Sequence, residues 1–291
     1  MTDNKETDIP EGFKLSQRRK QKNVDKEMFE WDATDKDRLT YQHYMIREFF
    51  HGNFNAPIED ALEQGIKVID VGCSTGIWAM EMAQDFPSST FIAANIVDEP
   101  LAKDLPGNCT FLRLNILEGL PFPDATFDYT FQRMMVAMYT PTEWLRVVSE
   151  MIRITKPGGY VEMIETDGVV QRPPQDFLKW NKAWETLTWS RGIDIYIVKK
   201  LHTLLEGSLS SVKNECISWP IGWYDRAGAM VGQYAKLYQL SIKPYMASLM
   251  GMTDDEYEQW AAQGTQKLRL QRSWINGYVA FGKKPKVYEY R

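Results

Sequence analysis

The sequence predicts an α/β fold built on a mostly parallel sheet that helices cover on both faces. Between residues 67 and 165, short apolar segments alternate with stretches of helical periodicity. This alternation is typical of crossover units, in which a helix connects two parallel strands. A second observation is the loop of small residues after the first apolar segment, because open parallel sheets bind ligands beyond the carboxyl ends of their strands.

The elements of this sheet follow in order along the chain. The expected helix at residues 140–155 has the clearest signals, since Thr140 can cap it, Pro141 takes its first position and Glu143 completes a capping box. The sequence KPGG at 156–159 is expected to form the turn that leaves this helix. The expected strands are residues 67–72, 90–95, 109–116, 127–133 and 160–165, with a helix at 76–86 after the first.

A helical extension is expected before the sheet. One helix is predicted at 34–53, with Thr34 or Asp35 as its cap, and a short helix at 57–65. Residues 1–30 are predicted to be a disordered tail, and residues 31–291 one domain. The basic segment 14–26 in this tail is either a solvated stretch, a nuclear import signal or an anion-binding arm.

The pattern changes after about residue 170. Helices are expected at 173–192, 193–208, 227–251 and 253–273, with strands at 211–222 and 273–285, so that a helical cover spans roughly 170–270. In the first helix, Trp180 and Trp184 are four residues apart and share one face, with Trp189 further along. This tryptophan-rich segment either covers an organic substrate or simply buries one face of a helix.

Composition and charge narrow the classes of function. The net charge of -5 disfavours nucleic acid as a partner, and no apolar run is long enough to predict a helix that crosses a membrane. Cys73, Cys109 and Cys216 are far apart, which argues against a disulfide framework and against a zinc site, so no metal is expected. The cysteines fit a reducing compartment, and the expected location is cytoplasmic or nuclear.

The loop at residues 70–76 distinguishes three kinds of cofactor. A phosphate-binding P-loop would need Lys and Ser or Thr after its last glycine, where Ile77 and Trp78 stand. A dinucleotide fingerprint starting at Gly72 fails at two of its three glycines. The pattern Asp-x-Gly-x-small-x-Gly, formed by Asp70, Gly72, Ser74 and Gly76, suits S-adenosylmethionine, whose amine and sulfonium are cationic. A plain tight turn between strand and helix is the alternative.

Motifs along the chain identify a family by resemblance. They are DRLTYQHYM, KVIDVGCSTGIWAMEMAQDFP, LEGLPFPDATFDYTFQRMM, EMIRITKPGGYVEMIE, RGIDIYIVKKLHTLLEG and YVAFGKKP. In this order they resemble class I S-adenosylmethionine-dependent methyltransferases, most closely the fungal LaeA-like group, over roughly residues 30–286. The resemblance implies a Rossmann-like sheet with an antiparallel last strand and a helical insertion after the fifth strand.

The resemblance also implies a cofactor site with three departures from the family pattern. Ser74 replaces a glycine, Asn95 replaces the acid that accepts the ribose hydroxyls, and Asn115 replaces an Asp near the adenine. Losing the charge at Asn95 is expected to cost about tenfold in affinity, unless Asp98 reaches in. The implied cofactor-binding residues are Asp70, Gly72, Cys73, Ser74, Gly76, Asn95, Ile96, Asn115, Ile116, Gln132 and Arg133.

The expected activity is transfer of a methyl group to a small-molecule or protein acceptor. Such a displacement mainly needs alignment and desolvation, with a base only if the acceptor must lose a proton. Candidate catalytic residues are Glu165, preferred to Glu162 on the same strand, and His43 and Tyr44 on the first helix. The three departures support an alternative, a weak or inactive methyltransferase-fold module that binds partners. The resemblance to a regulator implies a regulatory protein partner.

Overall fold

The computed structural model describes residues 33–96 and 105–286. The expected tail at 1–30, with its basic segment 14–26, and Asp98 lie outside the described residues. Among the helices that the structure describes, none is long and apolar enough to span a membrane.

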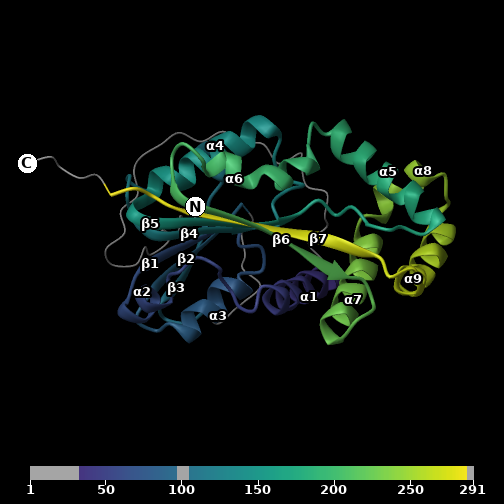
Figure 1. The fold of residues 1–291 in the computed structure, drawn as a ribbon, viewed down its shortest axis with the longest axis horizontal. Helices are drawn as coiled ribbons and strands as arrows, with labels where there is room; N and C mark the ends of the chain where they lie inside the picture. Colours follow the sequence, from purple (N-terminus) through teal and green to yellow (C-terminus); the bar gives the residue numbers. More distant parts are fainter. Residues whose placement is uncertain (1–32, 97–104, 287–291) are drawn as a thin grey trace, which may run out of the picture.

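Seven strands form one sheet through the middle of the described structure (Figure 1). The five parallel strands are neighbours, and β7 pairs antiparallel with both β5 and β6. This confirms the mostly parallel sheet with an antiparallel last strand. In spatial order the strands are β3 (Cys109–Arg113), β2 (Thr90–Asn95), β1 (Lys67–Val71), β4 (Phe127–Arg133), β5 (Thr155–Thr166), β7 (Trp274–Lys283) and β6 (Ser210–Pro220).

Helices cover both faces of the sheet, and a group of helices gathers at one end of it (Figure 1). One face carries α4 (Pro141–Ile154) and α6 (Leu201–Leu205), and the other carries α2 (Glu59–Gln64) and α3 (Ile77–Asp85). The group at the end comprises α5 (Gln175–Ser190), α7 (Arg226–Ser241), α8 (Lys243–Met250) and α9 (Asp254–Gln271), with α1 (Ala33–Phe49) packed against α7. The predicted helical insertion after the fifth strand is therefore present, and β6 runs within it.

Local capping signals in the sequence determine where two helices begin. At α4 the Thr140 hydroxyl accepts from the backbone N–H of Glu143, and the Glu143 carboxylate accepts from the N–H of Thr140. The same reciprocal pair, Thr253 and Glu256, starts α9. Because a capping box satisfies two backbone donors without any distant partner, both starts could be predicted from the sequence.

Two predicted boundaries were wrong. Helix α1 begins at Ala33, so Thr34 and Asp35 lie inside its first turn rather than before it. The KPGG segment belongs to β5, which begins at Thr155 and passes a register shift before it pairs regularly with β4. A separate turn is not needed, because the chain passes from α4 directly into the strand.

Two predicted helices are divided. The segment 193–208 forms a 3-10 helix, Ile195–Lys200, followed by the short helix α6. The long helix expected at 227–251 breaks at Ile242, just before Pro244. A proline lacks the N–H that would continue the helix and its ring clashes with the preceding turn, so α7 ends and α8 begins there.

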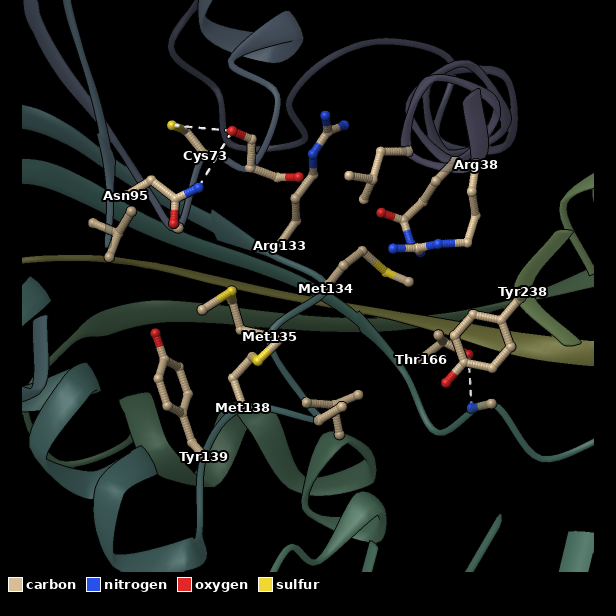
Figure 2. Close-up of a pocket in the computed structure, with 18 of the residues that line it drawn as sticks. Arg38, Cys73, Asn95, Arg133, Met134, Met135, Met138, Tyr139, Thr166 and Tyr238 are labelled. Carbon is tan, nitrogen blue, oxygen red and sulfur yellow. Dashed lines mark hydrogen bonds between the residues drawn. The ribbon is translucent and has the colours of Figure 1, made fainter. Parts of the chain in front are cut away.

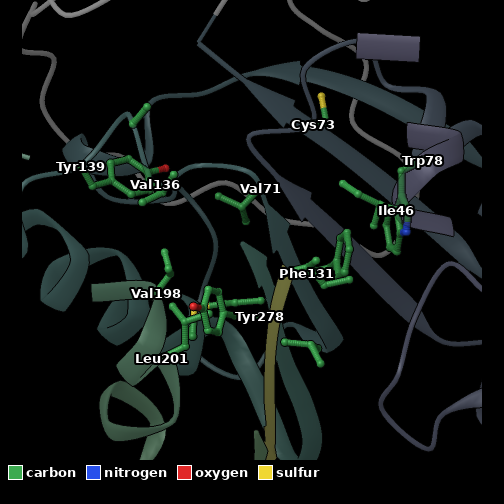
Figure 3. Close-up of a cluster of buried hydrophobic side chains, with 14 of the residues drawn as sticks. Ile46, Val71, Cys73, Trp78, Phe131, Val136, Tyr139, Val198, Leu201 and Tyr278 are labelled. Carbon is green, nitrogen blue, oxygen red and sulfur yellow. The ribbon is translucent and has the colours of Figure 1, made fainter. Parts of the chain in front are cut away.

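The core fixes the residue that follows the glycine loop. Trp78 stacks on Phe131 of β4, with the ring centroids 4.1 Å apart and the planes 11° from parallel (Figure 3). Its indole N–H donates to the backbone oxygen of Asn53 at 2.7 Å. Trp78 is therefore a buried residue that joins α3 to the sheet, and it does not line the cavity at the glycine loop.

Candidate active site

One cavity of about 390 Å³ opens at the carboxyl ends of the parallel strands. Its volume lies in the range of about 300–1,000 Å³ that is usual for ligand pockets. We call its two regions the strand end, lined by Gly72, Asn95 and Asn115, and the helix end, lined by Trp180, Trp184, Tyr234 and Tyr238. Figure 2 shows Asn95 at one side of the view, Tyr238 at the other, and methionines of the segment after β4 between them.

The glycine loop forms the floor of the strand end. Gly72 has a φ of +77°, and a Cβ at this position would lie 2.7 Å from the sulfur of Met135. Ser74 also adopts a positive φ, 52°, which a glycine would tolerate without strain. This explains why the family pattern places glycine at Ser74. The Ser74 hydroxyl is buried and has no hydrogen-bond partner among the described residues.

Asp70 lies beneath this loop with an unusual environment. Its side chain is buried, and within the described part of the chain neither carboxylate oxygen has a hydrogen-bond partner. Burial raises the pKa of Asp70 to about 7, against the opposing charge of Arg133. A buried carboxylate without partners costs free energy, and such groups concentrate at functional sites. Asp70 is not on the cavity wall, so it would act on a ligand through its charge or a small displacement.

The two asparagines at the strand end support the backbone around them. The Asn95 side-chain oxygen accepts from the N–H of Ile96 at 2.8 Å, and its amide donates to the Ser74 carbonyl at 3.3 Å. The Asn115 oxygen accepts from the N–H of Leu117 at 3.1 Å. Because an amide oxygen has two acceptor sites, each asparagine keeps one that a ligand can use.

A methionine-rich segment separates the two ends of the cavity. Met134, Met135 and Met138, in the segment 133–139 after β4, line the cavity and lie in the middle of Figure 2. Glu165 supports this segment from below, accepting from the N–H of Met135 at 2.8 Å and of Val136 at 2.9 Å. Burial raises the pKa of Glu165 to about 8, although both bonds oppose the shift. As placed, Glu165 does not line the cavity and holds its wall instead.

His43 braces Arg133, although it was predicted as a base. Arg133 donates to Nδ1 of His43 at 2.9 Å, and Nε2 of His43 lies 2.9 Å from the carboxylate of Glu81. Because a guanidinium can only donate, Nδ1 must be the acceptor and the proton of a neutral His43 sits on Nε2. Arg47 and Asn53 also donate to Glu81. Both ring nitrogens are thus engaged in holding the guanidinium at the cavity wall.

This arrangement predicts a pH dependence of stability. Burial lowers the pKa of His43, with the bond to Glu81 opposing and the charge of Arg133 adding to the shift. Below about pH 6.5 the unfolded chain therefore takes up a proton that the folded protein refuses, so His43 makes stability fall as the pH falls. In His43→Gln this contribution is absent. The free energy of unfolding is measured with urea for the variant and for wild type. The difference, variant minus wild type, is expected to be about 1 kcal/mol larger at pH 5.5 than at pH 7.5. Parallel pH profiles would contradict the assignment.

The structure brings together most of the predicted cofactor residues but not the catalytic ones. Tyr44 is 41% exposed and, like His43 and Glu165, does not line the cavity. The cavity wall also lacks Asp70, Gln132 and Gly76, which lie below or beside it. The predicted residues that do line it are Gly72, Cys73, Ser74, Asn95, Ile96, Asn115, Ile116 and Arg133.

The helix end is an aromatic chamber. Trp180 and Trp184 of α5 stack with centroids 6.3 Å apart, and Tyr238 of α7 meets Trp184 edge-on at 5.8 Å. Trp189, on the same helix, is 59% exposed and lies off the cavity. The cavity stays open because Trp78 belongs to the core and Met134 lines the wall without filling the space.

Sequence reasoning missed several residues of this site. Glu81, which holds His43, and the tyrosines Tyr234 and Tyr238 lie far along the chain from their partners. Nothing in the local sequence marks them, since their role depends on packing between distant helices. One available signal was the cluster of three methionines at 134, 135 and 138, directly after a strand. Methionine is typical of adaptable apolar binding surfaces.

Comparison with known proteins agrees with this geometry. A family model described as a methyltransferase domain matches residues 68–159. Methyltransferase str3 of Strobilurus tenacellus is 31% identical over 64% of this chain and 67% of its own length. The secondary metabolism regulator laeA of Coprinopsis cinerea is 26% identical over 47% of this chain and 34% of its own length.

A solved structure shares the fold. Phosphoethanolamine N-methyltransferase 2 of Haemonchus contortus superposes with a TM-score of 0.52 and 16% identity, over 87% of this chain and 59% of that one. At this identity the likeness concerns the architecture alone. With the family match and the similarity to str3, it agrees with the resemblance found in the motifs. The chain belongs to the class I S-adenosylmethionine-dependent methyltransferases, in the group that includes the LaeA-type regulators.

Proposed function

We propose that the strand end of the cavity binds S-adenosylmethionine and that the chain transfers its methyl group to an acceptor held at the helix end. The observation that carries this proposal is the single cavity that joins the glycine loop to the aromatic chamber. The family membership of the chain supports the same activity. So does its similarity to the methyltransferase str3, which extends over 67% of the length of that protein. The acceptor is a small molecule or a protein side chain, and a regulatory partner is expected from the likeness to laeA.

The residues at the strand end fit the amino-acid part of this cofactor. Asp70 offers a buried carboxylate without partners among the described residues, and Arg133 offers a half-buried guanidinium on the cavity wall. Burial lowers the pKa of Arg133 to about 10, so the group stays charged at neutral pH. No described carboxylate forms an ion pair with Arg133, whose guanidinium bonds to neutral His43. The charges of Asp70 and Arg133 would complement the ammonium and the carboxylate at the amino-acid end of S-adenosylmethionine.

Other residues would hold and shield the remainder. Asn95 and Asn115 present amide groups to a nucleoside, and the missing Cβ of Gly72 lets Met135 pack against the loop. When bound, the cofactor supplies a methyl on a sulfonium: the acceptor's lone pair forms the new bond to carbon while the S–CH₃ electron pair returns to sulfur. The methionine segment 134–138 excludes water from the space between the two ends. The sulfonium then transfers its methyl group to the acceptor rather than to water.

The binding step is tested by Arg133→Gln. Glutamine stays polar but is shorter, so the variant removes both the charge at the cavity wall and the bond to His43. We expect affinity for S-adenosylhomocysteine, measured by titration calorimetry, to fall by about 10- to 100-fold, as for loss of a hydrogen bond to a charged group. Arg269→Gln, on the exposed face of α9, is the matched control and should bind as wild type does. Absence of binding by wild type near millimolar ligand, or equal affinities of Arg133→Gln and wild type, would refute this assignment.

A further inference from the structure

The helix end has walls suited to a flat apolar ligand. Trp180, Trp184 and Tyr238 contribute rings, and Tyr234 lies beside them, its hydroxyl accepting from the amide of Gln42 at 2.9 Å. Aliphatic side chains complete the surface between the rings: Leu39, Val170, Ile221, Ala235, Leu268 and Ile275. Aromatic rings gain most from partners that are themselves aromatic and can stack offset or meet edge-on.

The chamber is enclosed. Trp180 and Trp184 of α5 contact Tyr238 of α7, and neighbouring protein atoms cover most of the surface of Trp180 and Tyr234, which are 3% and 4% exposed. Helix α1 closes a further side with Arg38 and Gln42. A ligand in such a space is almost entirely removed from water, so its charge must be matched by the wall.

The charges on the wall exclude one class of ligand. Among the described residues that line the cavity, carboxylates occur only at Glu118 and Glu143, in the 3-10 helix after β3 and at the start of α4. The helix end carries the guanidinium of Arg38, 5.9 Å from the centroid of the Tyr238 ring, and amides. In the part of the chain that the structure describes, no carboxylate lines the helix end to pair with a buried ammonium there.

We propose that the helix end binds the methyl acceptor and that this acceptor is a flat aromatic small molecule without a positive charge. The inference rests on the proposed function, since it assigns the acceptor side of the same cavity. It places the acceptor beside the rings of Trp180 and Tyr238, with the methionine segment 134–138 lining the space in which the acceptor meets the methyl group. A lysine side chain of a protein is disfavoured by the same charges.

Binding of three probes of similar size tests the inference on the full chain. The probes are 2-naphthol, the ammonium 2-naphthylmethylamine and the non-aromatic decahydro-2-naphthol, each titrated by calorimetry at pH 7.5 with saturating S-adenosylhomocysteine. We expect 2-naphthol to bind at least about tenfold more tightly than either of the others, as the ammonium lacks a counter-charge and the saturated ring cannot stack. Equal or tighter binding of the ammonium, or of the saturated alcohol, would overturn the proposal.

Two variants and one control variant locate the probe. Trp180→Leu removes a chamber wall, whereas Trp189→Leu makes the same change on the exposed face of the same helix. Ala235→Phe fills the chamber without removing a contact. We expect Trp180→Leu and Ala235→Phe to weaken 2-naphthol at least about tenfold and Trp189→Leu to leave it unchanged, as pocket shape sets such discrimination.

The outcomes separate this inference from the proposed function. S-adenosylhomocysteine should bind Ala235→Phe as it binds wild type, which also shows that the variant is folded. If wild type binds S-adenosylhomocysteine but none of the three probes, or if Ala235→Phe binds 2-naphthol normally, the acceptor assignment is wrong and the cofactor assignment stands. If wild type does not bind S-adenosylhomocysteine at all, the proposed function itself fails.

Discussion

Replacing Asp70 with asparagine is expected to stabilise the ligand-free protein at pH 8 while weakening its binding of the cofactor. The folded pKa of about 7 lies above the ordinary value of 3.8, so between these values the folded protein holds a proton that the unfolded chain has lost. Stability therefore falls as the pH rises through this window, and above it Asp70 is an ionised, buried group without partners. Asparagine removes this cost, and it also removes the charge that a cationic ligand would meet.

Thermal and urea unfolding across pH measure the first effect. The stabilisation by Asp70→Asn should be larger at pH 8 than at pH 5 by about 3 kcal/mol, at about 1.4 kcal/mol for each pH unit. Asp85→Asn, on the exposed side of α3, is the control and should change stability little at either pH. A loss of stability in Asp70→Asn that does not depend on pH would show that the carboxylate is satisfied in the folded protein. Such a trade of stability for binding is common at functional sites.

Replacing Glu162 with alanine is expected to cause the largest loss of stability. Glu162 is fully buried in β5 and accepts from the backbone N–H groups of Asn55 and Ala56, from the Asn55 amide, and from the hydroxyl of Tyr129 at 2.9 Å. It thus ties the segment before β1 to the centre of the sheet. Alanine would leave these donors buried without an acceptor, and each buried donor left unsatisfied costs about 1–3 kcal/mol.

The effect is measured by urea unfolding at pH 7, with Glu162→Gln and Glu215→Ala for comparison. Because glutamine keeps one acceptor oxygen, Glu162→Gln should lower the free energy of unfolding less than Glu162→Ala does. Glu215 is exposed on β6, so Glu215→Ala should lower it by less than about 0.5 kcal/mol. Equal effects of Glu162→Ala and Glu215→Ala would mean that the donors around Glu162 find other partners. Glu162 was a candidate for catalysis in the sequence, and its contacts assign it to the framework.

The parts of the fold that could be predicted depend on neighbours in the sequence. The capping boxes at Thr140 and Thr253 and the alternation of strands and helices need no distant contact. The glycine loop is also local, and of the residues in its Asp-x-Gly-x-small-x-Gly pattern Gly72 and Ser74 line the cavity. The break at Ile242 was missed although Pro244 signals it, because the apolar periodicity continues across it.

The rest of the site depends on contacts between distant segments. His43 meets Arg133 across 90 positions, and Gln42 meets Tyr234 across 192. A histidine on the helix before the sheet could be a base or a structural residue, and only the positions of Arg133 and Glu81 decide which it is. Likewise, alternation on β5 separates Glu162 from Glu165 but cannot show that both carboxylates are occupied by backbone donors.

A crystal structure of the chain with S-adenosylhomocysteine tests most directly whether the cavity is a methyltransferase site. We expect the nucleoside against Asn95 and Asn115 and the amino-acid part beside Arg133 and above Asp70. The helix end, beside Trp180 and Tyr238, should stay open for an acceptor. An empty cavity under saturating ligand, or a nucleoside seated in the chamber instead, would contradict the account.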